Sequence, residues 1–369
     1  MVYKKMIYKN LILNSKIWKQ LKNMVEQNKL PHAFIFHGSE GSGKEAHAIE
    51  FSVLLNDKQK PNYIEKIMNF QYPNINLIIP LPREKTIHKK SDALNAISDK
   101  SLETLIKMKK EKMRSPYKKI YFEKGNGILI NSIRDIKKNI NTNIINKKEY
   151  MIHIIFEAEK LCEPRIEPGN ALLKILEEPP ENNIFILVTS NKNKILDTIQ
   201  SRCCDFYFPK LTTTEIKKYL DNEKIEIKIE LDLLIKLANN NIKSILNMIT
   251  LGDNINSLKN DAIALIKNII NDNNWNADIK KMEILFRKNK ETFKIFIKLV
   301  IFILNDLEKI KNKKTNCVIL KRINKVQNLN YANCINIIEQ NYLELNKNLN
   351  PAIGLFSMAI NMKKAMKIN

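Results

Sequence analysis

The chain has 369 residues, with 62 lysines and arginines against 39 aspartates and glutamates, so its formal net charge is +23. This length predicts two or three domains and a sizeable core. The five cysteines have spacings that fit neither a disulfide framework nor a C-x-x-C zinc module, which excludes a small disulfide-stapled domain and favours a reduced, cytoplasmic location.

The positive charge comes almost entirely from lysine, because the chain contains only seven arginines. Abundant lysine, asparagine and isoleucine share A/T-rich codons, so part of the charge is attributed to drift on a solvated surface. Contact with DNA, which a basic surface favours, therefore stays open. Each of the seven arginines is therefore a candidate functional residue, since a planar guanidinium can form paired hydrogen bonds that a lysine cannot.

The first elements along the chain form a phosphate-binding loop in its expected context. Residues 14–30 read as an amphipathic helix, 33–37 as a buried strand, and 45–55 as a helix. The turn between them fits G-x-x-x-x-G-K-[ST] through Gly38, Gly43 and Lys44, with Gly41 as a further loop glycine. Backbone N–H groups of such a loop, together with Lys44, bind phosphate oxygens.

Glu45 departs from this motif, because it stands where a serine or threonine hydroxyl should bind magnesium. A carboxylate about 4 Å from a phosphate charge is repelled by roughly 1 kcal/mol in water and roughly 4 kcal/mol at an effective dielectric of 20. We therefore expect ATP and Mg²⁺ binding to be weak or lost, with no required cofactor and no metal site. The alternative is that the Glu45 carboxylate binds the metal directly.

Residues 56–125 are rich in lysine and broken by prolines, which predicts an irregular insertion that is partly ordered at best. A helix is expected to begin at 128–136. Residues 151–156 follow as a second buried strand.

Glu157 comes directly after that strand. In P-loop ATPases the corresponding strand carries an Asp for the magnesium shell and then a Glu that polarises water. Here Phe156 occupies the Asp position, so Glu157 is a candidate base that lacks a metal to act with. The alternative is that Glu157 and Glu159 simply open the next segment in solvent.

Alternating helices and strands continue to residue 208. A helix over 170–178 is stopped by two prolines, a strand over 184–191 ends on the candidate ligand Asn191, and 206–208 is a last short strand. Ser201, Arg202 and Cys203 lie just before that strand. The alternation indicates an α/β fold with a mainly parallel sheet.

After Pro209 only helices are expected. Thr212 and Glu215 fit a capping box. The most apolar run, 295–304, is interrupted by Lys298 and is shorter than the ~20 residues of a membrane span, so it predicts a core helix and no membrane partner.

Four sequence motifs follow one another in the order found in a known protein family: HAFIFHGSEGSGKE (32–45), FEAE (156–159), NALLKILEEPP (170–180) and TIQSRC (198–203). They resemble the AAA+ subunits of bacterial DNA polymerase III clamp loaders, over about the first 250 residues. A weaker likeness, NLNPAIGLFSMAINM (348–362), is similar to the last helices of delta-prime subunits.

The resemblance implies three domains: an AAA+ P-loop α/β domain over 1–210, a small helical lid over 211–255, and an all-α collar over 256–369. It implies partners as well, namely gamma/tau and delta subunits in a hetero-pentameric ring that places the sliding clamp on primed DNA. Within the motif Ser201-Arg202-Cys203, Arg202 would reach a neighbour's ATP as an arginine finger, and such a cation contributes a factor of roughly 10³–10⁵ in rate. The alternative is that Arg202 is a local salt-bridge partner. Lys243 lies near the family's basic sensor position, without its usual glycine and arginine context.

Two departures shape the functional hypothesis. Many related subunits carry a four-cysteine zinc module after the P-loop helix, whereas residues 56–125 contain no cysteine. The losses at Glu45 and Phe156 resemble the delta-prime type, a stator with no activity alone. The alternatives are an active gamma/tau-like ATPase, and a DNA-binding AAA+ relative that has lost ATP coupling.

Overall fold

The computed structural model describes residues 6–56, 66–67, 72–142, 149–251, 253–320, 327, 329–345, 347 and 350–367. Residues 57–65 and 68–71 of the expected insertion, and 348–349 of the C-terminal motif, lie outside the described residues. The chain divides into two compact units. The first comprises Met1–Ile225 with Asn241–Lys243, and the second comprises Glu226–Asn240 with Ser244–Asn369. The finer division into lid and collar stays a prediction.

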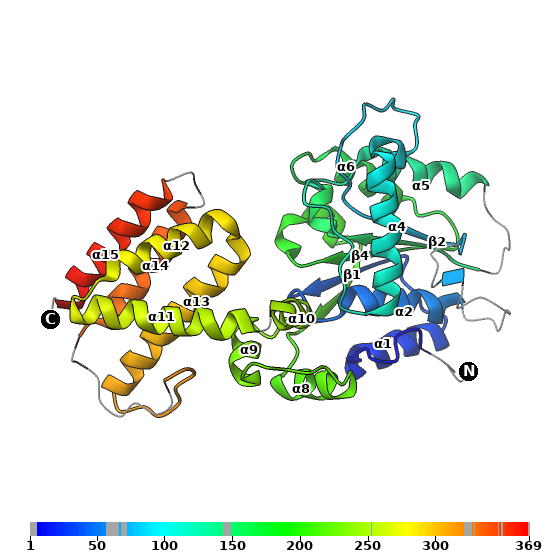
Figure 1. Cartoon of the computed structure of the whole chain (residues 1–369). Coiled ribbons are helices and arrows are strands. Elements are labelled where there is room, and N and C mark those ends of the chain that lie inside the picture. The colour runs from blue at the N-terminus through cyan, green and yellow to red at the C-terminus, as the bar shows by residue number, and fades with distance from the viewer. Residues whose placement is uncertain are drawn as a thin grey trace. The chain divides into compact units, whose positions relative to one another are not determined.

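The first unit is built on a five-stranded sheet in the order β2-β3-β4-β1-β5 (Figure 1). All its pairings are parallel. The strands are β1 (Ala33–Gly38), β2 (Ile75–Ile78), β3 (Met151–Phe156), β4 (Asn183–Thr189) and β5 (Cys204–Phe208). Strand β1 lies between β4 and β5. The loop that follows β1 leaves the sheet at its carboxyl edge, which is where ligands of open α/β sheets bind.

Helices cover both faces of the sheet because the central strands are apolar on both sides. On one face, α2 (Lys44–Asn56) brings Phe51 to within 5.2 Å of Phe34, ring centroid to centroid. On the other face, α5 (Ile130–Thr142) and α6 (Glu167–Glu177) bury side chains such as Ile136 and Leu172 against the strands. The predicted α/β class with a parallel sheet is confirmed.

The segment 56–125, for which the sequence predicts an irregular insertion, includes regular elements within its described part. It contains β2, the short helix η1 (Ala93–Ala96) and the long helix α4 (Asp99–Arg114). The helix begins at Ser98, whose hydroxyl accepts a hydrogen bond from the N–H of Ser101. It buries Leu105, Lys112 and Met113, so a lysine forms part of its inner face.

The remaining elements of the first unit are short connections around the sheet and two terminal helices. Helix α8 (Thr213–Asn222) begins with the predicted capping box, in which Thr212 and Glu215 each accept a hydrogen bond from the other's backbone N–H. The other elements are α1 (Ser15–Glu26), η2 (Ala158–Leu161), η3 (Lys192–Lys194) and α7 (Asp197–Gln200).

The second unit is helical, as expected for the C-terminal region. Its helices are α9 (Leu231–Leu237), α10 (Ile242–Leu251), α11 (Asp253–Asn271), α12 (Trp275–Lys288), α13 (Lys290–Lys311), α14 (Tyr331–Leu345) and α15 (Pro351–Lys367). The core helix α13 contains the apolar run 295–304 and packs against α9, α11, α12 and α14. No described helix is long and apolar enough to cross a membrane.

Candidate functional site

The loop between β1 and α2 has the backbone of a phosphate-binding loop. Gly38, Gly41 and Gly43 adopt φ angles of 144°, 77° and 81°, which side-chain-bearing residues rarely adopt. At Gly38 an added Cβ would lie 2.0 Å from the carbonyl oxygen of Phe208, because β1 and β5 pair closely there. The glycine spacing found in the sequence is therefore required by the geometry.

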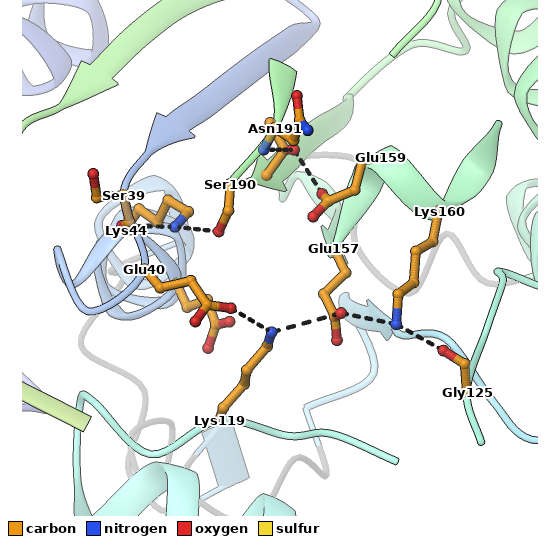
Figure 2. A network of polar contacts seen from close by, with 12 residues as sticks. Ser39, Glu40, Lys44, Lys119, Gly125, Glu157, Glu159, Lys160, Ser190 and Asn191 are labelled. Atoms are coloured by element: carbon orange, nitrogen blue, oxygen red, sulfur yellow. Dashed lines mark hydrogen bonds and ion pairs between the residues drawn. The ribbon is translucent and has the colours of Figure 1, made fainter. Parts of the chain in front are cut away.

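Lys44, at the start of α2, is buried and turned toward protein atoms. Its Nζ donates to the carbonyl of Ser39 and to the hydroxyl of Ser190, each at 3.0 Å. Burial lowers the pKa of Lys44, with the attraction of Glu45 and Glu40 acting against it. The amine that would bind phosphate is thus already satisfied by neutral oxygen atoms (Figure 2).

Glu45 forms an ion pair with Lys112 of α4, in which the lysine is buried and the carboxylate is partly buried. The Lys112 Nζ lies 2.6 Å from Glu45 Oε2, and it also donates to the carbonyl of Pro116 at 3.0 Å. Burial opposes ionisation of Glu45, but the charge and hydrogen bond of Lys112, with the charges of Lys119 and Lys44, together outweigh it, and the pKa of Glu45 lies below its usual range. The carboxylate is therefore held ionised by an ammonium group.

The same ammonium faces Phe156, at the end of β3. The Lys112 Nζ is 5.7 Å from the centre of the Phe156 ring, and only 1% of the lysine side chain is exposed. Lys112 thus lies between the two positions, Glu45 and Phe156, where a P-loop ATPase has its magnesium-binding hydroxyl and aspartate. The residues present do not fit Mg²⁺, since one oxygen is committed to Lys112 and the other position has no oxygen.

Glu157 is held by two lysines. Its Oε2 lies 2.9 Å from the Nζ of Lys160 and 3.6 Å from that of Lys119, which also contacts Glu40 at 3.1 Å (Figure 2). The Glu157 side chain is only 10% exposed, so it is not a solvated residue opening the next segment. Its backbone is left-handed, at φ 51° and ψ 49°, a conformation that costs on the order of 1 kcal/mol or more. The ion pairs offset part of that cost.

Asn191 contributes to this region through its backbone. Its N–H donates to the Oγ1 of Thr189 at 3.0 Å, and that hydroxyl donates to Glu159 at 2.6 Å. The Asn191 side chain is exposed. The residue that contacts Lys44 is Ser190, the neighbour of the predicted ligand Asn191.

Lys243 lines the cavity at the loop. Its Nζ is 5.9 Å from the centre of the Tyr121 ring, which the Nζ atoms of Lys119 and Lys160 also approach at 5.5 and 5.7 Å. Three lysines thus surround one aromatic side chain beside the P-loop.

The cavity at the loop is small, about 40 Å³, whereas ligand pockets commonly measure roughly 300–1,000 Å³. Part of its lining comes from the segment 56–125, through Lys112, Pro116, Tyr117 and Lys119. The lining comprises Glu40, Gly41, Gly43, Lys44, Glu45, Lys112, Pro116, Tyr117, Lys119, Glu157, Val188, Thr189, Ser190 and Lys243. Among the residues that the structure describes, no cluster of three or more histidine, cysteine or acidic side chains could hold a metal ion.

Arg202 is not among the residues that line this cavity. It follows α7, where its guanidinium donates to the carbonyl of Thr198 at 2.7 Å and to Glu177 at 3.2 Å, with 35% of the side chain exposed. Ser201 is exposed, and its hydroxyl donates to the same Thr198 carbonyl. Cys203 packs against the core, and burial raises the pKa of its thiol to about 12. Of the three, only Arg202 presents a charged group at the surface.

Residues 13–212, which hold the P-loop and Arg202, match the family described as DNA polymerase III, delta subunit. The chain belongs to this family. The tau subunit of Bacillus subtilis is 27% identical over 253 residues, which cover 67% of this chain and 38% of that protein. The gamma/tau subunit of Mycoplasma genitalium is 28% identical over 257 residues, covering 69% and 36%. The chain thus spans little more than a third of the length of these relatives.

A solved gamma subunit-related protein of Thermotoga maritima is similar at 15% identity and a TM-score of 0.42. That comparison covers 94% of the delta-family chain and all of the solved one.

Sequence reasoning missed Lys112, Lys119, Lys160 and Ser190 as members of the site. A signal for α4 existed, since Ser98 precedes Asp99 as an N-cap and Leu105 and Met113 lie on one helical face. No signal distinguishes Lys112 from the other lysines, because its role depends on contact with Glu45, which is 67 residues away in the chain.

Proposed function

We propose that this delta-family chain is a non-hydrolysing subunit, of the delta-prime type, in a DNA polymerase III clamp loader, and that it supplies Arg202 to the ATP site of a neighbouring subunit. The observation that carries the proposal is the ion pair between Glu45 and Lys112. It removes Glu45 from metal binding at the P-loop, while Arg202 remains at the surface. The chain would then act on a neighbour's nucleotide and not on its own.

Catalysis of phosphoryl transfer in P-loop ATPases requires a metal ion between the β- and γ-phosphates. With Glu45 paired and Phe156 apolar, the chain's own loop lacks the ligands for that ion. Glu157 remains as a carboxylate, but Lys119 and Lys160 bind it. No water-activating role follows for Glu157 here.

Arg202 has the properties that an arginine finger needs. Its guanidinium can stabilise charge on a transferred phosphoryl group. In this chain it pairs with Glu177, but both side chains are substantially exposed, 35% and 46%. Ion pairs of this kind contribute about 0–1 kcal/mol, so a neighbour's phosphates can displace Glu177 at little cost.

The proposal includes the assembly implied by the sequence. Gamma/tau and delta subunits would form a ring with this chain, the helices of the second unit would join its collar, and the complex would place a sliding clamp on primed DNA in the cytoplasm. DNA polymerase III subunits named tau and gamma/tau are its relatives, which supports this choice of partners.

The test measures DNA-stimulated ATP hydrolysis by the complex reconstituted with gamma/tau and delta from the same organism. Replacing Arg202 with alanine should lower turnover at the adjoining site by roughly 10³-fold, so total turnover falls by that site's share. Arg165→Ala is the matched control, because Arg165 is another exposed arginine of the first unit. Unchanged turnover in a complex of normal stoichiometry would remove the role of Arg202.

A second measurement distinguishes the stator from an active ATPase. The purified chain should show no turnover above that of its Lys44→Ala variant. Turnover that depends on Lys44 would instead identify a motor subunit and refute the proposal.

A further inference from the structure

Lys112 carries the only described ammonium group that contacts both Glu45 and Phe156, the residues at the two substituted metal-binding positions. We propose that this ammonium takes the place of the divalent metal cation, so that the P-loop is closed by the chain's own charges and binds no metal–nucleotide complex. The inference deepens the proposed function, since it concerns the same P-loop, but it does not depend on Arg202.

The first support is the position of the charge. A metal ion at a P-loop is held by the hydroxyl that follows the loop lysine and by the aspartate of the neighbouring strand. Lys112 Nζ lies 2.6 Å from the side chain at the first position and 5.7 Å from the ring centre at the second. The ring also suits a cation, because its face attracts positive charge where an aspartate would otherwise do so.

The second support is the completeness of the pairing. Lys112 donates to Glu45 and to the Pro116 carbonyl, so its charge and two of its N–H groups are satisfied by the protein. A cation that is 1% exposed would be strongly disfavoured without such partners. The three carboxylates of the lining, Glu40, Glu45 and Glu157, are each paired with a lysine.

The third support is that protein side chains fill most of the space beside the P-loop. Lys112, Pro116, Tyr117 and Lys119 all line the cavity, which leaves about 40 Å³. Tyr117 is tied to the N-terminal segment, because its hydroxyl accepts a hydrogen bond from the N–H of Ile12 at 3.0 Å. Phosphate groups entering the loop would meet Glu40 and Glu45 and would have to displace this segment.

One consequence is specific to a cation that replaces a metal. If Lys112 is removed, Glu45 becomes a partly buried carboxylate without the ammonium group that pairs with it. Carboxylate oxygens are the ligands that hard divalent cations prefer. The site should then gain a response to metal that the natural chain lacks, whereas a lysine that merely braces α4 against α2 would produce no such gain.

The experiment records thermal unfolding of the full chain with 1 mM ADP, in the presence and absence of MnCl₂. The natural chain should show the same midpoint in both. Lys112→Met should unfold roughly 10 °C lower without metal, because it leaves the partly buried charge of Glu45 unpaired. Adding MnCl₂ should raise the midpoint of that variant by several degrees, since a ligand that binds the folded state stabilises it.

Two controls separate the outcomes. The double variant Lys112→Met with Glu45→Gln should lose the response to MnCl₂, because the carboxylate is gone. Lys110→Met, at an exposed position of the same helix, should behave as the natural chain does. Absence of a manganese response in Lys112→Met, or its persistence in the double variant, overturns the proposal.

A direct measurement covers the case in which Lys112→Met does not fold. Titration of MnCl₂ into the natural chain with ADP, followed by the loss of the free Mn²⁺ electron paramagnetic resonance signal, should show no stoichiometric site. A stoichiometric site overturns the proposal. Neither result changes what Arg202 does in the assembled complex, so the two proposals fail separately.

Discussion

The guanidinium of Arg202 donates to the Oε1 atom of Glu177 at 3.2 Å, which joins the end of α6 to the segment before β5. Both residues come from the runs by which the chain resembles clamp-loader subunits, NALLKILEEPP and TIQSRC. The two motifs are therefore in direct contact through these side chains. Glu177 pairs with the arginine side chain at the surface without burying it.

Glu177→Gln should release Arg202 while leaving the fold intact. The free energy of unfolding should fall by less than about 1 kcal/mol, because the pair is exposed to solvent and its charges are screened. Turnover of the reconstituted complex should stay level or rise, since the guanidinium no longer has a competing carboxylate. Glu178→Gln, the exposed neighbour, is the control. A loss of turnover as large as that of Arg202→Ala would show that Glu177 positions the arginine and does not compete for it.

Gly38→Ala should destabilise the first unit by about 3 kcal/mol, measured by urea unfolding. The backbone there has a φ of 144°, and an added Cβ would lie 2.0 Å from the carbonyl oxygen of Phe208. Ser39→Ala is the matched control, because Lys44 contacts only the backbone carbonyl of Ser39. Equal stability of the two variants would contradict the close pairing of β1 with β5.

The P-loop and the central strands could be predicted because their signals are local. Apolar runs over 33–37 and 151–156 match β1 and β3, and the glycine spacing indicates the turn between β1 and α2. The apolar run at 295–304 likewise lies in the core helix α13.

The missed parts depend on tertiary contacts. Strand β2 has only four residues and pairs with β3 alone, at one edge of the sheet, so its apolar signal is short. Helix α4 carries many lysines on exposed positions, which hid its single buried face. The pairing of Lys112 with Glu45 joins α4 to α2, and no pattern within either helix reveals it.

Stability should fall as the pH drops from about 6.5 to about 4, because two buried histidines must stay neutral. Burial lowers the pKa of His47 and of His153 to about 4. The unfolded chain binds protons at these residues from about pH 6.5 downward, whereas the folded chain resists protonation to about pH 4. Each residue therefore removes roughly 2 kcal/mol of stability by pH 5.

A hydrogen bond of His47 also favours the neutral imidazole in the folded chain. His47 Nε2 accepts a hydrogen bond from the N–H of Asn14 at 3.0 Å, which requires that nitrogen to be unprotonated. Urea unfolding at pH 7 and pH 5 measures the loss. His153→Phe should reduce the difference between the two pH values, and His88→Gln, at an exposed position, should not. A difference that His153→Phe leaves unchanged would assign the pH dependence to other groups.

Asp306→Ala should destabilise the second unit by roughly 3 kcal/mol or more. Asp306 is fully buried in α13, and its carboxylate accepts hydrogen bonds from the N–H groups of Val318, Ile319 and Leu320, at 2.8, 2.5 and 3.0 Å. Alanine would leave these donors without their acceptor in a buried place, which costs more than the hydrogen bonds themselves contribute. Asp306→Asn keeps one acceptor oxygen and should lose less than the alanine variant, as measured by urea unfolding followed by circular dichroism. If the two variants lose the same stability, packing of the side chain and not the acceptor oxygens fixes the segment after α13.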